Sequence, residues 1–168
     1  MASNIEMKAR VGDPAALRAR ALSLKPHEVF ELEQVDTFFR CETGRLKLRQ
    51  FADGSAELIA YQRPNTQGAR ESVYYRTPTS DGEGLLQALT SSLGIKTIVR
   101  KNREVMLVGQ SRIHLDRVES LGDFMEIEVV LRPEQSAADG EIILADLMAD
   151  LGITSEHCIA GAYADFIA

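Results

Sequence analysis

The first segment of the chain alternates between polar and apolar side chains without a break. Residues 4–11 read Asn-Ile-Glu-Met-Lys-Ala-Arg-Val. Because successive side chains of a strand point to opposite faces, this period of two predicts a strand with one apolar face and one charged face. The pattern constrains the fold, since the charged face must meet either bulk water or a hydrated interior.

Two later segments repeat this alternation with complementary charges. Residues 45–49 read Arg-Leu-Lys-Leu-Arg, which places three cations on one face, and residues 125–129 read Met-Glu-Ile-Glu-Val, which places two carboxylates on one face. Three such strands are typical of a barrel that is lined with charge and packed on its outside. The alternative is a set of half-buried strands whose exposed faces carry cross-strand ion pairs. Alternation alone does not separate these two interpretations.

The remaining periodicities predict about eight strands and three helices in a single domain, residues 1–168. Predicted strands cover residues 4–11, 32–39, 45–51, 56–63, 70–76, 95–108, 112–118 and 124–131. The first helix follows Asp13-Pro14 and ends at Lys25-Pro26, the second runs from a Ser80–Glu83 capping box to Gly94, and the third covers about 140–151.

Hairpin-length connections such as Asp53-Gly54 favour antiparallel pairing in this sheet. The predicted fold class is therefore α+β, with an eight-stranded antiparallel sheet that is curled or closed and is flanked by helices. The second helix is expected to bury a leucine stripe, and the third to turn Ile143, Leu147, Met148 and Leu151 inward. The apolar tail to Ala168 is expected to pack back on the body.

Composition excludes several classes of protein. The net charge of −6 argues against a nucleic-acid binder driven by overall charge. No apolar run approaches the ~20 residues needed to cross a bilayer, and no secretory signal opens the chain, so we expect a cytoplasmic protein without a membrane anchor. Cys41 and Cys158 are expected to be free thiols.

The charged faces of the predicted strands suggest a binding site for a polyanion together with a metal ion. The cations are Lys8, Arg10, Arg45, Lys47, Arg49, Lys101, Arg103 and Arg112, and the carboxylates are Glu6, Asp116, Glu126 and Glu128. If they line one interior, that interior must be wet, because unpaired buried charges are prohibitive. Magnesium pairs carboxylates with substrate phosphates, and arginine and lysine clamp phosphates. A triphosphate bridged by magnesium fits this inventory better than a monophosphate does.

At these residues the sequence resembles the CYTH superfamily, also called triphosphate tunnel metalloenzymes, and looks closest to the class IV adenylyl cyclases. The family opens with Glu-x-Glu-x-Lys, where this chain has Asn4-Ile5-Glu6-Met7-Lys8. Further matching segments are 34–39, 46–49, 101–103, 113–116 and 121–128. The resemblance covers nearly the whole chain and implies a closed eight-stranded antiparallel tunnel that binds a triphosphate.

The resemblance also implies roles for individual residues. Metal ligands would be Glu6, Glu126 and Glu128, holding Mg²⁺ with Mn²⁺ as the alternative. Asp116 would be a catalytic or supporting carboxylate, with Lys101 and Arg103 as catalytic cations. The predicted phosphate-binding residues are Lys8, Arg45, Lys47, Arg49, Arg63, Lys101 and Arg103. Arg63 precedes Pro64, where the family often has a lysine before Gly-Pro.

Three functions remain open at this point. The first is a class IV-type adenylyl cyclase that converts ATP to cyclic AMP and pyrophosphate. The second is an inorganic or organic triphosphatase, and the third is a nucleotide- or polyphosphate-binding module without turnover. The third is motivated by Asn4, which replaces the first glutamate of the opening motif and brings no charge to a metal. The expected partners are a nucleoside triphosphate or inorganic polyphosphate. The sequence leaves the oligomeric state open, and a homodimer is one alternative because related cyclases are often dimers.

Overall fold

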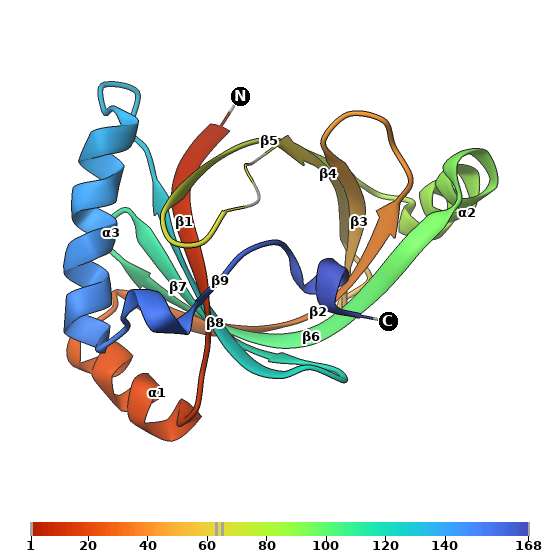
Figure 1. Ribbon diagram of the computed structural model, residues 1–168. Helices are drawn as coiled ribbons and strands as arrows, with labels where there is room; N and C mark the ends of the chain where they lie inside the picture. The colour runs from red at the N-terminus through yellow and green to blue at the C-terminus, as the bar shows by residue number, and fades with distance from the viewer. Residues whose placement is uncertain (1, 63, 65, 168) are drawn as a thin grey trace.

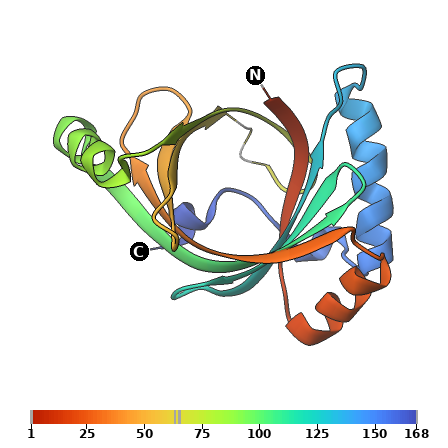
Figure 2. The ribbon, with the colours of Figure 1, turned by 180° about the vertical axis from the view of Figure 1, so that it is seen from behind.

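The computed structural model of the protein describes residues 2–62, 64 and 66–167. Eight antiparallel strands form a closed barrel in the order β5-β4-β3-β2-β6-β7-β8-β1, and pairing of β1 with β5 closes it (Figures 1 and 2). This confirms the predicted architecture. The strands are β1 (Ala2–Arg10), β2 (Glu28–Phe39), β3 (Arg45–Phe51), β4 (Ala56–Gln62), β5 (Arg70–Thr79), β6 (Ile95–Val108), β7 (Ser111–Val118) and β8 (Gly122–Val130).

The apolar face of β1 points out of the barrel and its polar face points in. Ile5, Met7 and Ala9 are buried in a hydrophobic cluster outside the barrel wall. Lys8 is also almost fully buried, at 4% exposure, but it lines the barrel interior. The alternation of the first segment therefore reflects a barrel whose hydrocarbon core lies outside the wall and whose interior is charged.

Three helices cover the outside of this wall (Figure 1). They are α1 (Pro14–Ser23), α2 (Gly82–Leu93) and α3 (Ala137–Leu151). Helices α1 and α3 lie on one side, where α3 packs on β1 and β8, and α2 lies on the other side against β2 and β3. Asp13 caps α1 by accepting a hydrogen bond from the Ala16 amide, and Pro14 follows it, as the sequence predicted. Helix α1 ends at Ser23, two residues before the predicted stop.

The start and the buried face of α2 differ from the prediction. The cap is Asp81, whose carboxylate accepts a hydrogen bond from the Gly84 amide, so the predicted Ser80–Glu83 capping box is wrong. The helix has no fully buried residue, and Leu93 is 37% exposed. The stripe is only half buried because α2 packs on the outside of the wall alone, with no second layer beyond it.

Helix α3 and strand β2 both begin earlier than predicted. Ser136 and Asp139 form a capping box that starts α3 at Ala137, about one turn before the expected position. Leu144, which the prediction missed, is among the buried residues of this helix. Strand β2 begins at Glu28, because its first four residues pair with β6.

The C-terminal segment crosses one end of the barrel (Figure 1). After α3 the chain forms a short 3₁₀ turn, η1 (Ser155–His157), then β9 (Cys158–Ile159), which pairs with β1 beyond β5, and finally η2 (Tyr163–Phe166). Tyr163 and Ala164 join a buried cluster at this end, which confirms that the tail packs back on the body. We call this cluster the floor, and its buried members are Phe38, Ile59, Tyr61, Val99, Val118, Phe124, Tyr163 and Ala164.

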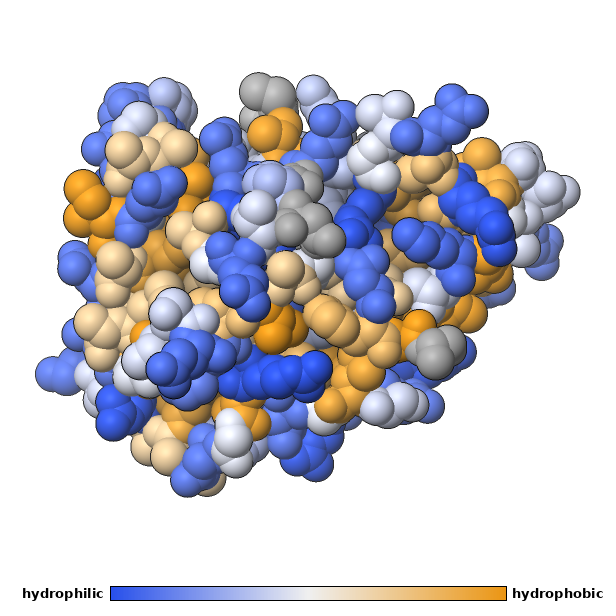
Figure 3. Space-filling view, in the orientation of Figure 1, coloured by the Kyte–Doolittle hydropathy of each residue, from blue (hydrophilic) through white to orange (hydrophobic). Residues whose placement is uncertain are grey.

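Seen from the same side, the space-filling view shows side chains over much of the area that the ribbon leaves open (Figure 3). Cys41 is exposed and Cys158 is buried, and both are free thiols as predicted. Among the described residues, no helix combines the length and the apolar composition that crossing a bilayer requires.

Candidate functional site

The barrel interior contains a cavity of about 470 Å³ whose lining includes many charged side chains. Within the described part of the chain, seven Lys and Arg side chains and four carboxylates line it, which gives an excess of three positive charges without counting His114. The whole chain carries −6, so the interior is basic within an acidic molecule. The charged and ionisable lining residues are Glu6, Lys8, Asp36, Lys47, Arg49, Arg76, Lys101, Arg103, Arg112, His114, Glu126 and Glu128.

One group of charges lies on β2, β3 and β6, and we call it the Asp36 cluster. Arg49 donates two hydrogen bonds to the Asp36 carboxylate, from Nε to Oδ1 and from Nη2 to Oδ2, both 2.8 Å long. Lys101 Nζ donates to Oδ2 at 2.9 Å, and Lys47 Nζ donates to the same oxygen at 3.2 Å. Three cations thus share one carboxylate, and the cluster has positive charge to spare for an anion.

Burial and these ion pairs shift the pKa values of the Asp36 cluster. Although burial alone would raise the pKa of Asp36, Arg49, Lys101 and Lys47 hold it well below its usual value. Burial lowers the pKa of Lys101 to about 8, against the opposing effect of Asp36. Burial, followed by repulsion from Arg49, lowers the pKa of Lys47 well below its ordinary value. An anion that enters the cavity would favour the charged form of both lysines.

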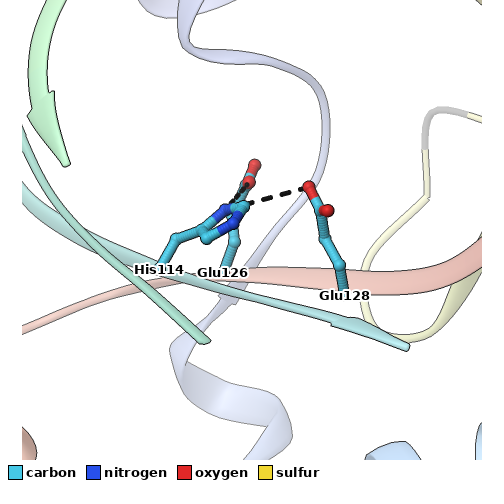
Figure 4. A group of neighbouring side chains, drawn as sticks. All are labelled: His114, Glu126 and Glu128. Atoms are coloured by element: carbon cyan, nitrogen blue, oxygen red, sulfur yellow. Dashed lines mark hydrogen bonds and ion pairs between the residues drawn. The ribbon is translucent and has the colours of Figure 1, made fainter. Parts of the chain in front are cut away.

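A second group of charges lies on β1, β7 and β8, and we call it the Glu126 cluster. His114, Glu126 and Glu128 bring one potential ligand atom each to within 4.8 Å of one another (Figure 4). His114 Nδ1 lies 3.2 Å from Glu126 Oε2 and 3.8 Å from Glu128 Oε1. Lys8 Nζ lies 2.8 Å from Glu126 Oε1, and Arg103 Nη2 lies 3.3 Å from Glu126 Oε2.

The register of three neighbouring strands brings the Glu126 cluster together. On β8, Glu126 stands opposite both Lys8 of β1 and His114 of β7. Glu128, two residues on and on the same face, stands opposite Glu6 of β1. Burial alone would raise the pKa of Glu126, but Lys8, Arg103 and His114 hold it well below its usual value. The carboxylate is therefore kept ionised and ready to accept a cation.

Arg103 joins this cluster to the floor. Its guanidinium group makes two hydrogen bonds to Asp116, from Nε to Oδ1 and from Nη2 to Oδ2, both 2.7 Å long. Tyr163 donates its hydroxyl proton to Asp116 Oδ2, also at 2.7 Å. Burial alone would raise the pKa of Asp116, but Arg103 lowers it below its usual value. Asp116 thus lies behind Arg103, where it fixes the orientation of the guanidinium group.

The donor set of this wall fits a divalent cation. Carboxylates and an imidazole are ligands that divalent ions accept, with oxygen preferred by magnesium and imidazole tolerated by manganese and later metals. The side-chain oxygen of Asn4, which lines the same cavity, is buried without a hydrogen-bond donor among the described residues. Such a buried acceptor gains a partner when a cation or an ordered water binds beside it.

The cavity also has an apolar part, which sequence reasoning missed. Phe30, Leu32, Phe51 and Leu107 line it on β2, β3 and β6. Phe30 stands eight residues before Phe38 of the floor on the same strand and is 36% exposed. The end of the cavity away from the floor therefore carries aromatic and aliphatic surface beside the charged walls.

The structure brings most of the predicted site residues into this cavity. They are Glu6, Lys8, Lys47, Arg49, Lys101, Arg103, Glu126 and Glu128. Arg45 is different, because it pairs with Asp165 at 2.8 Å and does not line the cavity. Arg10, another of the pooled cations, is exposed and lies over the rings of Phe124 and Phe166. The prediction for Arg63 falls outside the described residues.

Several residues of the site were not identified from the sequence. Asp36 occupies an inward position of the strand 32–39, and the pairing of Gln34 and Asp36 at a spacing of two was the available signal. Arg70 is buried, with its Nε 3.8 Å from Glu6 Oε1, and nothing in its local sequence distinguishes it from a surface arginine. The contribution of Tyr163 depends on a tertiary contact that sequence spacing does not report.

Comparisons with known proteins identify structures with a similar fold. The protein PH1012 from Pyrococcus horikoshii OT3 has a similar structure, with a TM-score of 0.87, 22% identity, and coverage of 98% of this chain and 99% of that chain. A provisionally named adenylate cyclase from Vibrio parahaemolyticus matches with a TM-score of 0.80, 18% identity, and coverage of 96% and 95%.

The provisionally named adenylyl cyclase HpAC1 from Hippeastrum, described as having a dominant triphosphatase activity, matches with a TM-score of 0.65, 18% identity, and coverage of 95% and 91%. At these identities the structural matches establish the fold alone. No curated protein matches the chain significantly. The model of the CYTH domain matches residues 2–163, nearly the whole chain, and the protein therefore belongs to the CYTH domain family.

Proposed function

We propose that the protein is a metal-dependent enzyme acting on an organic triphosphate, and that it is a class IV-type adenylyl cyclase forming cyclic AMP and pyrophosphate from ATP. One observation carries the proposal. A cluster with excess positive charge and a cluster of carboxylates with an imidazole share a single cavity. A polyphosphate chain with its divalent counterion requires both clusters. A monophosphate or a metal ion alone requires only one of them.

Lys47, Arg49 and Lys101 bind the phosphate chain in this proposal. They already share Asp36 as their anionic partner, so phosphate oxygens join an existing set of donors. Lys8 and Arg103 face the same cavity from β1 and β6 and extend the set toward the Glu126 cluster. Arginine offers paired donors to phosphate oxygens, and each lysine offers a compact charge.

Glu126 and Glu128 would hold the metal ion, with Glu6, His114 and Asn4 beside them. A bound divalent ion would neutralise phosphate charge and lower the pKa of a coordinated hydroxyl group. Magnesium and manganese both accept carboxylate oxygens, and the imidazole of His114 makes manganese the better match for this ligand set.

The chain's own contribution to the reaction is positioning and electrostatic stabilisation. The 3′ oxygen of the ribose bonds to the α-phosphorus while the bond from that phosphorus to the bridging oxygen breaks. Pyrophosphate leaves, and the hydroxyl proton passes to water in the cavity. The cations of the Asp36 cluster hold the departing pyrophosphate, whose negative charge grows during the step.

The apolar part of the cavity favours an organic triphosphate over inorganic tripolyphosphate. Phe30 and Phe51 offer ring faces, and Leu32 and Leu107 offer aliphatic surface, beside the charged walls. A nucleoside can bury its base there while its phosphates reach the cations. Inorganic tripolyphosphate would leave this surface in contact with water.

A triphosphatase is the second candidate, in which water replaces the ribose hydroxyl as the nucleophile. The same charged walls serve hydrolysis, since only the position of the attacking oxygen differs. The structural similarity to HpAC1, which carries a cyclase name and a dominant triphosphatase activity, is the specific observation in its favour.

The test is an incubation of the purified protein with Mg²⁺ or Mn²⁺ and either ATP or tripolyphosphate, followed by separation of the products. Cyclic AMP and pyrophosphate in equal amounts are expected from ATP. Orthophosphate without cyclic AMP would replace the cyclase by the triphosphatase. Thermal stabilisation by a triphosphate without any product would indicate a binding module.

A further inference from the structure

Tyr163, near the C-terminal end of the chain, touches charged groups on three strands of the barrel. We propose that Tyr163 is a positioning residue of the phosphate site, and that the segment Ala162–Asp165 forms one wall of that site. This inference rests on the proposed function, because it assigns Tyr163 a role in holding the cations that bind the triphosphate.

The first contact is the hydrogen bond from the Tyr163 hydroxyl to Asp116. It is 2.7 Å long and ends on Oδ2, the oxygen that also accepts from Arg103 Nη2. Asp116 is 3% exposed, so water cannot easily substitute for the hydroxyl group. Tyr163 therefore limits the rotation of the carboxylate, and the carboxylate in turn fixes the plane of the Arg103 guanidinium group.

The second contact joins the aromatic ring to the lysines. Lys8 Nζ lies 3.7 Å from the ring centroid of Tyr163, and Lys101 Nζ lies 5.8 Å from it. The ring face attracts both ammonium groups without carrying a formal negative charge. It can hold the lysines in place while leaving their charge available for phosphate. A carboxylate at this position would neutralise them instead.

The segment that carries Tyr163 is anchored on both sides. Arg45 makes two hydrogen bonds to Asp165, at 3.1 and 2.8 Å, and Asp165 accepts a further hydrogen bond from the Ala162 amide at 2.7 Å. On the other side, Arg70 Nη2 donates to the Gly161 carbonyl at 3.1 Å. Arg45 therefore anchors the segment Ala162–Asp165 and does not line the cavity, in contrast to its predicted role as a phosphate-binding residue.

Packing also fixes the ring from below. The ring centroids of Tyr163 and Phe124 lie 5.0 Å apart at an interplanar angle of 59°, and Tyr163 is 4% exposed. Removing only the hydroxyl group should therefore leave the ring where it is. This separates the role of the hydrogen bond from the role of the ring, so that each can be tested by its own substitution.

The experiment measures tripolyphosphate affinity by calorimetry in the full-length protein, with turnover of ATP followed in parallel. Tyr163→Phe keeps the ring and removes the hydrogen bond to Asp116, and we expect a roughly three- to tenfold weaker affinity, the net contribution of about one ordinary hydrogen bond. The expected kinetic change is a higher KM with kcat within about twofold, because positioning of Lys8 and Arg103 acts on bound phosphate. The matched control is Tyr75→Phe, which removes the hydroxyl of a tyrosine that is 60% exposed.

A double-mutant cycle separates positioning from a general loss of packing. If Tyr163 acts through Asp116, the effects of Tyr163→Phe and Asp116→Asn on affinity do not multiply in the double variant. Tyr163→Leu, which removes the ring as well, should weaken affinity further than Tyr163→Phe. Thermal unfolding of every variant reports whether the fold is kept.

The outcomes distinguish the inference from the function on which it rests. If the Tyr163→Phe variant binds tripolyphosphate as tightly as the wild-type protein does, the inference is overturned while the proposed function stands. Effects that multiply in the double variant would also overturn it, because Tyr163 would then act independently of Asp116. A wild-type protein without affinity for tripolyphosphate or ATP would overturn the proposed function and the inference together.

Discussion

The Asp36 cluster and the Glu126 cluster are built from the same kinds of residue in opposite proportions. The Asp36 cluster has one carboxylate among three cations. The Glu126 cluster has two carboxylates and an imidazole, with two cations at its edge. Most members of both clusters are buried, and Lys47 and Glu128 are only partly exposed, so bulk water compensates little of their charge. In the proposed function, an anion completes the first cluster and a metal ion completes the second.

In the proposed function, this difference allows one barrel to bind a metal–polyphosphate complex. Strands β3 and β6 carry inward cations and flank β2, which carries Asp36, whereas β8 carries two inward carboxylates. A ligand with opposite charges on its two sides satisfies both walls at once.

Neutralising the carboxylate at the centre of the second cluster should abolish metal-dependent turnover. Glu126→Gln keeps the size of the side chain but removes the charge that a metal ion requires, so we expect activity to fall by about a hundredfold or more. Steady-state rates in Mg²⁺ and in Mn²⁺ provide the measurement, and circular dichroism verifies the fold. Glu141→Gln, on the exposed face of α3, is the control. Undiminished activity would remove Glu126 from the site.

Neutralising the single carboxylate of the first cluster should act mainly on stability. Asp36→Asn leaves Lys47, Arg49 and Lys101 buried without their shared anion, at a cost of about 3–5 kcal/mol in the free energy of unfolding. Urea denaturation measures this loss, and Asp146→Asn on α3 should change stability by less than about 0.5 kcal/mol.

Tripolyphosphate should restore part of the stability lost in Asp36→Asn, because its oxygens replace the missing carboxylate. Its thermal stabilisation should therefore exceed that of the wild-type protein at the same ligand concentration. An equal or smaller thermal shift would show that these cations do not receive the phosphate chain.

Adding charge at Asn4 should sharpen the metal side of the comparison. Asn4→Glu restores a carboxylate to a buried position that lines the cavity, and we expect metal affinity to rise about tenfold. Titration with Mn²⁺ followed by electron paramagnetic resonance measures the affinity directly. Asn4→Gln lengthens the side chain without adding charge and serves as the control. Equal metal affinities in the Asn4→Glu and Asn4→Gln variants would show that metal binding does not depend on charge at this position.

The smallest expected effect is a pH dependence of phosphate binding. The pKa of Lys101, lowered by burial to about 8, lies below the value of about 10.4 in an unfolded chain. Between these values the unfolded chain binds more protons, so the contribution of Lys101 to stability rises with pH across this window. Tripolyphosphate affinity should move the other way, falling about threefold or more as pH rises through 8 and Lys101 loses its charge.

Calorimetric titrations between pH 7 and 9.5 measure this change in affinity. Lys101→Arg keeps its charge throughout this range, so its affinity should vary much less with pH. An identical fall in that variant would assign the pH dependence to another group.

Much of the barrel could be predicted from the sequence because its signals are local. Strands β3 and β6 were predicted with the bounds that the structure has, since their alternation begins and ends at clear turns. The start of α2 was wrong because Ser80 and Asp81 are both good caps, and the choice between them depends on where the helix meets the barrel. Local pattern alone cannot report that contact.

The site was predictable where charge alternates along one strand and not where it depends on contacts between distant segments. Lys8, Arg49 and Glu126 could be assigned to one face of their strands because charged and apolar residues alternate there, and the structure turns that face into the cavity. Arg45 continues the same alternation but lies at the end of β3, where it pairs with Asp165 and does not line the cavity. Tyr163 is separated by 47 residues from the carboxylate that it holds, and no periodicity connects them.

The floor of the barrel also affects the route by which substrate enters and products leave the cavity. Buried aromatic side chains pack with the C-terminal segment at that end, so we expect substrate and products to pass through the opposite end. In the proposed reaction, the product bound deepest among the cations would have to wait for whatever lies nearer the exit. Single-file passage of this kind would make the sequence of product release a property of the architecture, independent of how tightly each product binds.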